Sequence, residues 1–135
     1  MKPIFCTLHL LLLFCAVRGN GQQKKATAAE LAAGKKVYEL NCLVCHQKDG
    51  DGVPRLNASL VGSKIVNGNT ATLIKVVLLG SEIAGVSTGQ YNNPMPAQPH
   101  LSDAEIAVVL TYIKHHFQNK PGIVRPHEVK QQRKK

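Results

Sequence analysis

The stretch Cys42-Leu43-Val44-Cys45-His46 decides how this chain folds. Two thiols three residues apart, followed directly by an imidazole, are typical of covalent haem attachment. On a helical turn the two sulfurs lie on one face, and the histidine follows where its ring can reach the iron. We therefore expect one haem c, attached through Cys42 and Cys45, with His46 as an axial ligand.

Two other kinds of site use a CxxC pair. A redox dithiol usually lies in a βαβ unit, and a zinc site needs a second pair of ligands. The sequence shows neither a strand pattern nor a second ligand pair. Both alternatives are therefore weaker than haem attachment, and a dithiol oxidoreductase is only a third choice of function.

Residues 1–19 have the pattern of a secretory signal peptide, in which Lys2 precedes an apolar run that ends at Val17. This run has about 14 residues, fewer than the roughly 20 that span a bilayer. Phe14 does not fit the small residue expected before a lipid-modified Cys15, so we do not expect a lipid anchor. The predicted location is exported and periplasmic.

Removal of this signal leaves 116 residues, in which Cys42 and Cys45 are the only cysteines. A domain of this size buries a modest fraction of its surface. A large, flat, apolar cofactor would supply the missing core volume, which agrees with haem. The aromatic residues that remain are Tyr38, Tyr91, Tyr112 and Phe117.

The formal charge of +9 lies mainly at the two ends of the chain. Residues 26–129 hold nine Lys and Arg against eight Asp and Glu, a net of +1. No nucleic-acid-binding motif accompanies the basic residues, so we expect no nucleic-acid partner. The basic ends favour association with a membrane surface or an acidic partner. They hold Lys24, Lys25, Lys130, Arg133, Lys134 and Lys135.

Three main helices are predicted, and each begins at a capping residue. Thr27 and Ser102 start capping boxes with a Glu three residues later, and Asn69 is a plain N-cap. Gly34 in the first helix suggests close approach of another helix. The apolar residues of the last helix recur at helical spacing as far as Phe117. They are Ile106, Val109, Leu110, Ile113 and Phe117.

Long loops separate these helices, over residues 47–69 and 81–100. Pro121-Gly122 should stop the last helix, and a short helix follows at best from Pro126. No strand pattern or repeat appears anywhere. The expected fold class is therefore all-α, with three main helices and long loops wrapped around one covalently bound haem.

Met95 is the candidate for the second iron ligand, because it is the only methionine besides Met1. Its neighbours Pro94 and Pro96 restrict the backbone and would stiffen the segment that holds the sulfur. His100 is an alternative ligand. On the other side of the iron, a rigid carbonyl near Pro54 could accept the Nδ1 proton of His46.

At this point the chain resembles class I cytochromes c, from about residue 29 to 120. The resemblance implies the cytochrome c fold, with the first and last helices crossing at the Gly34 and Tyr112 positions. It also implies that the Pro54 carbonyl bonds to His46 and that Met95 is the distal ligand. The matching residues are Gly34, Tyr38, Cys42, Cys45, His46, Pro54, Leu56, Met95, Pro96 and Tyr112.

A closer similarity is to the small cytochrome domains that accompany membrane-associated quinoprotein dehydrogenases and respiratory oxidases. It is carried by Tyr91-Asn92 before Met95-Pro96, by residues 101–106 and by residues 110–113. One departure is Ile65, where relatives often carry an aromatic residue. This puts the contacts to the haem propionates there in doubt.

The expected organisation is a signal peptide over 1–19, a polar linker over 20–26, a cytochrome c domain over 27–120 and a C-terminal extension over 121–135 with a basic tail. The expected function is transfer of one electron between extracytoplasmic or membrane-bound redox proteins, such as a membrane-associated dehydrogenase or oxidase. The chain is not expected to be an enzyme. The alternative is a peroxidase-like haem enzyme with a labile distal ligand.

Overall fold

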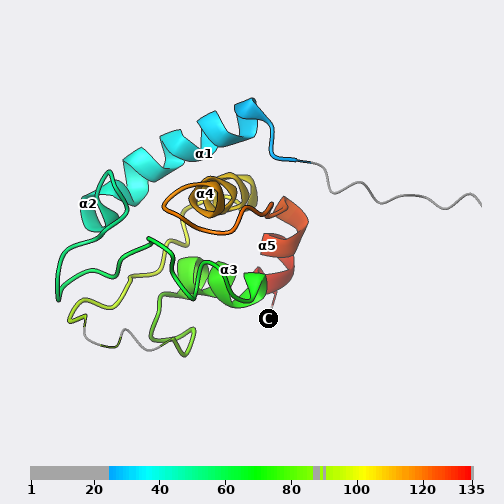
Figure 1. The fold of residues 1–135 in the computed structure, drawn as a ribbon. Coiled ribbons are helices and arrows are strands. Elements are labelled where there is room, and N and C mark those ends of the chain that lie inside the picture. The colour runs from blue at the N-terminus through cyan, green and yellow to red at the C-terminus, as the bar shows by residue number, and fades with distance from the viewer. Residues whose placement is uncertain (1–24, 87–88, 90, 135) are drawn as a thin grey trace, which may run out of the picture.

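The computed structural model describes residues 25–86, 89 and 91–134 (Figure 1). The expected signal peptide and residues 20–24 of the linker lie outside the described residues. The described part holds five helices and no sheet, which confirms the all-α fold class. The helices are α1 (Ala28–Asn41), α2 (Leu43–His46), α3 (Thr70–Leu79), α4 (Asp103–His115) and α5 (Pro126–Arg133).

All three predicted N-caps are present. The Thr27 hydroxyl accepts from the Glu30 N–H at 3.1 Å, and the Glu30 carboxylate accepts from the Thr27 N–H at 2.8 Å. Ser102 and Glu105 make the same reciprocal pair at the start of α4. These bonds fix where α1 and α4 begin, because they satisfy amides that have no partner inside the helix.

The C-terminal end of α4 differs from the prediction. The helix ends at His115, so Phe117 does not belong to it. Phe117 and Gln118 have φ angles of 55° and 56°, which a right-handed helix cannot contain. The Asn119 side-chain amide donates to the Ile113 and His116 carbonyls, both at 3.2 Å, and so closes the helix end.

Helix α1 crosses α4 at its glycine, as the resemblance implied (Figure 1). Gly34 is buried, and a Cβ at this position would lie 2.6 Å from the Tyr112 Cβ and closer still to the Val108 carbonyl oxygen. One helical turn further along α1, the Tyr38 ring packs against Tyr112, with ring centroids 5.6 Å apart. The direction of α1 across α4 is therefore fixed by direct contact.

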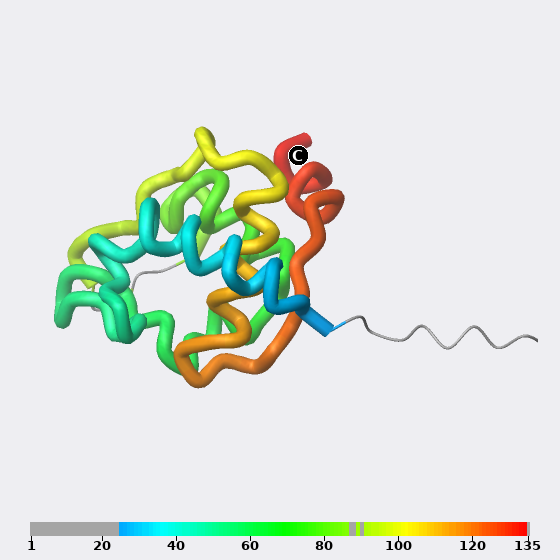
Figure 2. Tube along the Cα trace, turned by 90° about the horizontal axis from the view of Figure 1, so that it is seen from above, coloured from blue at the N-terminus to red at the C-terminus, as the bar shows by residue number. Residues whose placement is uncertain are grey.

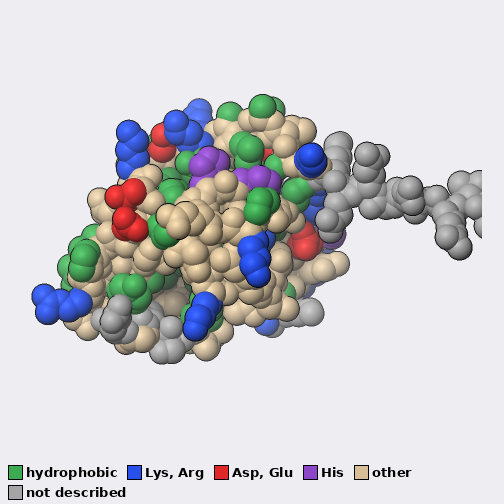
Figure 3. Space-filling model, viewed as in Figure 1, with side chains coloured by type: hydrophobic (Ala, Val, Ile, Leu, Met, Phe, Trp, Pro, Cys, Tyr) green, Lys and Arg blue, Asp and Glu red, His purple; other side chains and the backbone are tan. Residues whose placement is uncertain are grey.

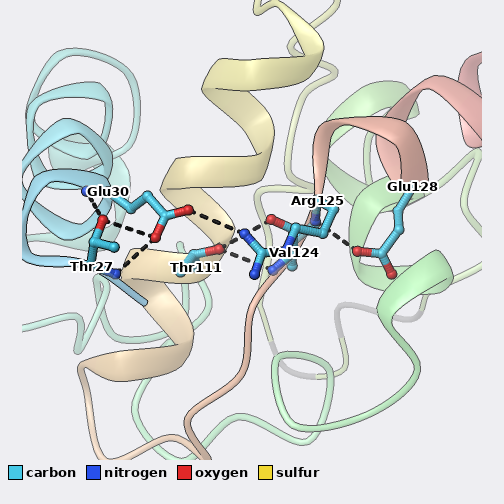
Figure 4. A network of polar contacts seen from close by, with 6 residues as sticks. All are labelled: Thr27, Glu30, Thr111, Val124, Arg125 and Glu128. Carbon is cyan, nitrogen blue, oxygen red and sulfur yellow. Dashed lines mark hydrogen bonds and ion pairs between the residues drawn. The ribbon is translucent and has the colours of Figure 1, made fainter. Parts of the chain in front are cut away.

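The C-terminal extension is part of the packed structure. Val124 and Val129 are buried in the core, and α5 packs against α3 and α4. Figure 2 shows the chain leading into α5 beside the start of α1, and the Arg125 guanidinium donates to Glu30 there at 3.2 Å. Thr111 of α4 bonds the Val124 main chain in the same network (Figure 4). Residues 124–129 thus belong to the same hydrophobic core as α3 and α4.

Within the described part of the chain, no helix has both the length and the apolar character needed to cross a membrane.

We predict that Gly34→Ala lowers the free energy of unfolding of the haem-loaded protein. Overpacking costs roughly 1–3 kcal/mol, which exceeds the gain of at most about 1 kcal/mol in helix propensity. Chemical denaturation followed by circular dichroism measures the change. Ala33→Val, on the exposed side of α1, is the control and should cost only a fraction as much. Equal stability of Gly34→Ala and the wild type would contradict the close crossing.

Candidate functional site

A partly open cavity of about 670 Å³ reaches from the surface into the core. Its walls are mostly apolar, and α3 and α4 each supply three side chains. Protein interiors are packed so densely that voids much larger than a water molecule are rare. A cavity of this size in the core therefore indicates a site built around a large apolar group. The six helical side chains are Leu73, Val76, Val77, Val109, Leu110 and Ile113.

Cys42, Cys45 and His46, the three residues expected to attach and bind haem, all line this cavity. The last turn of α1 leads directly into α2, where the His46 N–H donates to the Cys42 carbonyl at 2.9 Å. The Tyr38 hydroxyl then bonds the Gln47 carbonyl at 2.7 Å. This bond fixes the backbone where the chain leaves the motif.

The protonation states suit iron ligation by His46 and argue against a reactive dithiol. Burial lowers the pKa of His46, so its imidazole is neutral at pH 7. Its Nδ1 lies 2.9 Å from the Ala58 carbonyl and must be the donor, because a carbonyl oxygen only accepts. The lone pair on Nε2 is then available for a metal. Burial raises the pKa of Cys42 to about 11, unlike the reactive thiolate of a redox dithiol.

The predicted partner of His46 was wrong. The carbonyl that accepts from its Nδ1 belongs to Ala58, not to Pro54. Val53 and Asn57 exchange main-chain hydrogen bonds of 3.1 and 2.9 Å, which makes Pro54 part of an exposed turn. The residue that contacts the imidazole, Ala58, directly follows this turn in the chain. Among the described residues, the Pro54 carbonyl has no hydrogen bond to His46.

Met95 also lines the cavity, and its backbone is bonded to the end of α3. The Met95 N–H donates to the Ser81 hydroxyl and the Ser81 N–H donates to the Met95 carbonyl, both at 3.0 Å. Gly80, with a φ of 84°, has no side chain between the two segments; a Cβ there would lie 2.8 Å from the Met95 oxygen. Ser81 thus holds the candidate ligand by both of the backbone polar groups of Met95.

Two further contacts hold the chain on either side of Met95. The Asn92 and Asn93 N–H groups donate to the carbonyls of Arg55 and Leu56 at 2.8 and 3.0 Å. Beyond Met95, the Gln98 N–H donates to the Val77 carbonyl at 2.8 Å. The exposed turn that contains Pro54 therefore supports the methionine segment instead of the histidine.

The other described histidines lie elsewhere. His100 is exposed, and its Nε2 lies 3.1 Å from the Asn41 side-chain oxygen. The His115 and His116 Nδ1 atoms bond carbonyls one turn back in α4. Among the described residues, no group of three or more His, Cys, Asp or Glu side chains could hold a metal ion, which leaves the zinc alternative without support.

Sequence reasoning missed Ala58 and Ser81. Ala58 acts through its main-chain carbonyl, and no side-chain pattern marks such a group. Ser81 follows directly after Gly80, where α3 ends. A hydroxyl next to a helix-terminating glycine is a weak signal, which gains meaning only once Met95 is known to lie beside it.

Comparison with known proteins agrees with this geometry. A sequence profile of the cytochrome c family matches residues 31–117, which is more than half of the chain. The chain therefore belongs to the cytochrome c family. Its cofactor is haem c, attached covalently through the CxxC pair Cys42 and Cys45.

Several relatives are cytochrome subunits of dehydrogenases. The cytochrome c subunit of a quinone alcohol dehydrogenase from Gluconobacter oxydans is 33% identical over 104 residues, 75% of this chain and 22% of the relative. The fructose dehydrogenase cytochrome subunit of Gluconobacter japonicus is 32% identical over 130 residues, 89% of this chain and 26% of the relative. This chain thus spans about a quarter of the length of these subunits.

A shorter relative is cytochrome c-552 of Thermus thermophilus. It is 37% identical over 90 residues, which is 61% of this chain and 66% of the relative.

The residues that line the cavity fit a haem. The attachment thiols and a neutral imidazole are on its wall, and the remaining lining is largely apolar. Ile65, the predicted departure from the family, lines the cavity and is 36% exposed. Its side chain offers no hydrogen-bond donor to a propionate.

We predict that the double variant Cys42→Ala/Cys45→Ala folds poorly. Without an attached cofactor the core surrounds a large cavity, and the chain loses the stabilisation that a bound group gives to the folded state. Circular dichroism should show much less helix than in the haem-loaded wild type. Val44→Ala, which changes a side chain in the same motif that is 81% exposed, should keep both haem and helix content. Full helix content in the double variant would contradict this prediction.

Proposed function

We propose that this chain carries one electron at a time between redox proteins, with His46 and Met95 as the axial ligands of its haem iron. The observation that carries the proposal is the pair of hydrogen bonds between the Met95 backbone and Ser81, one to the Ser81 hydroxyl and one from its N–H, at the cavity wall. It holds a thioether beside the cavity that the thiols and imidazole line. Membership of the cytochrome c family supports the same function.

When bound, haem supplies an iron that changes oxidation state by one electron. The protein's own residues contribute fixed ligands and a dry surrounding. Ala58 orients His46, Ser81 holds Met95, and the apolar side chains of α3 and α4 exclude water. A site held this firmly needs little rearrangement when the charge changes, which suits an electron carrier better than an enzyme with a labile ligand.

The proposed partners are membrane-associated or extracytoplasmic redox proteins, such as a dehydrogenase or an oxidase. Relatives named as dehydrogenase cytochrome subunits support this proposal. On the face seen in Figure 3, Lys and Arg side chains are spread over the surface, with Asp and Glu side chains among them. The proposed location is periplasmic, as the pattern of residues 1–19 predicts.

We predict that Met95→Ala keeps its haem but loses the sulfur ligand that favours reduced iron. The near-infrared sulfur-to-iron absorption band should disappear and the midpoint potential should fall. Protein mass tests haem retention, the near-infrared spectrum of the oxidised protein tests the band, and spectroelectrochemistry measures the midpoint potential. His100→Ala is the control and should keep the band. Loss of the band in His100→Ala, or its survival in Met95→Ala, would overturn the ligand assignment.

A second prediction concerns the residue that holds Met95. Ser81→Ala removes the acceptor of the Met95 N–H, and a buried unpaired donor costs roughly 1–3 kcal/mol of unfolding free energy. The looser segment should let added imidazole displace the sulfur more easily, which raises the apparent affinity for imidazole. Denaturation and imidazole titration measure the two effects.

Ser59→Ala is the matched control, since the Ser59 hydroxyl also lines the cavity and accepts a main-chain hydrogen bond, from Val61 at 3.0 Å. It should lose stability without gaining affinity for imidazole. If both serine variants bound imidazole as the wild type does, Ser81 would have no part in holding the ligand.

A further inference from the structure

Lys114 is a buried cation close to the cofactor cavity. The residue is 8% exposed, and its Nζ donates to the Val66 carbonyl at 2.7 Å. Val66 is 1% exposed, and its side chain lines the cavity. One residue therefore separates the lysine charge from the haem site. Ile113, the neighbour of Lys114 on α4, lines the same cavity.

No carboxylate balances this charge within the described part of the chain. The ion pairs found there join Lys35 to Glu39, Arg125 to Glu30 and Arg133 to Asp103. Burial lowers the pKa of Lys114, and no charged neighbour opposes that effect. The surrounding structure shields the ammonium at this position from water.

We propose that Lys114 is a positioning residue that raises the midpoint potential of the haem through its buried positive charge. Oxidised haem carries one more positive charge than reduced haem, so a nearby cation disfavours the oxidised form. The effect is strong only where water does not screen it, as at a buried site. This inference rests on the proposed electron-carrier function, in which the potential sets the direction of transfer.

The same lysine also has a structural contact that must be separated from its charge. It holds the segment around Val66, and the neighbouring Asn67 ties that segment to the turn after α4. The Asn67 amide donates to Asn119 at 3.1 Å, and its carbonyl oxygen accepts from the Lys120 N–H at 2.7 Å. A useful set of variants therefore changes the charge and the hydrogen bond independently.

Three variants of Lys114 achieve this separation. Lys114→Gln keeps a donor for the Val66 carbonyl without the charge, Lys114→Arg keeps both, and Lys114→Met keeps neither. Asn67→Ala loosens the same segment at constant charge. Lys36→Met removes an exposed charge on α1 that does not line the cavity.

The test is the midpoint potential of each haem-loaded protein, measured by spectroelectrochemistry at pH 7. We expect a clear fall in Lys114→Gln and Lys114→Met, with Lys114→Arg, Asn67→Ala and Lys36→Met close to the wild type. Unchanged potentials in the two neutral variants would overturn the proposal. An equal fall in Lys114→Arg or Asn67→Ala would also overturn it, because loop position and not charge would then set the potential.

A second readout keeps the test valid if a variant is less stable. The unfolding free energies of the ferric and ferrous forms are linked to the midpoint potential by a thermodynamic cycle. Removing the buried charge should therefore stabilise the folded ferric form relative to the folded ferrous form. Equal changes in both forms would contradict the proposal. The near-infrared sulfur band reports Met95 separately, so its absence from the wild type would count against the ligand assignment and not against Lys114.

Discussion

The close crossing of α1 and α4 at Gly34 is the contact on which the rest of the site depends. The attachment motif begins where α1 ends, so the direction of α1 decides where the thiols lie. Because Gly34 lets the α1 backbone touch α4 at Val108 and Tyr112, that direction is fixed. The apolar face of α4, with Leu110 and Ile113, is then next to the motif. Helix packing thus places the motif beside the cavity, and the hydrogen bonds of Tyr38 to Gln47 and of His46 to Ala58 then fix its orientation.

The side of the cavity that holds Met95, here called the methionine wall, is positioned by hydrogen bonds instead of by helix packing. No helix carries Met95, and its position depends on hydrogen bonds from main-chain groups to the end of α3 and to the turn over Val53–Asn57. Such bonds require particular backbone paths more than particular side chains. Gly80 and Ser81 are exceptions, because the first must lack a side chain and the second supplies a hydroxyl. This wall should therefore tolerate sequence change except at those two residues and at Met95.

The difference between these two sides of the cavity explains what the sequence could reveal. Helix starts were predictable because Thr27, Ser102 and Asn69 mark them with side chains that bond free amides. The cofactor was predictable because covalent attachment needs two thiols and an imidazole at fixed spacing. The Ala58 carbonyl was not, since a main-chain acceptor leaves no trace in residue type. The end of α4 was also missed, because Phe117 adopts a positive φ that its apolar character does not suggest.

Some of the basic residues that give the chain its formal charge of +9 form ion pairs at the C-terminal end. Arg133 lies 2.6 Å from Asp103 and also donates to the Leu101 carbonyl, so it joins the end of α5 to the start of α4. Arg125 is likewise half-buried against Glu30. These residues act as contacts within the fold, which leaves Lys130 and Lys134 among the exposed charges at this end. Exposed charges are screened over a Debye length of about 8 Å at physiological salt, so these lysines have little influence on groups farther away than that. A buried cation near the cofactor escapes that screening, and this difference is the physical basis of the role proposed for Lys114.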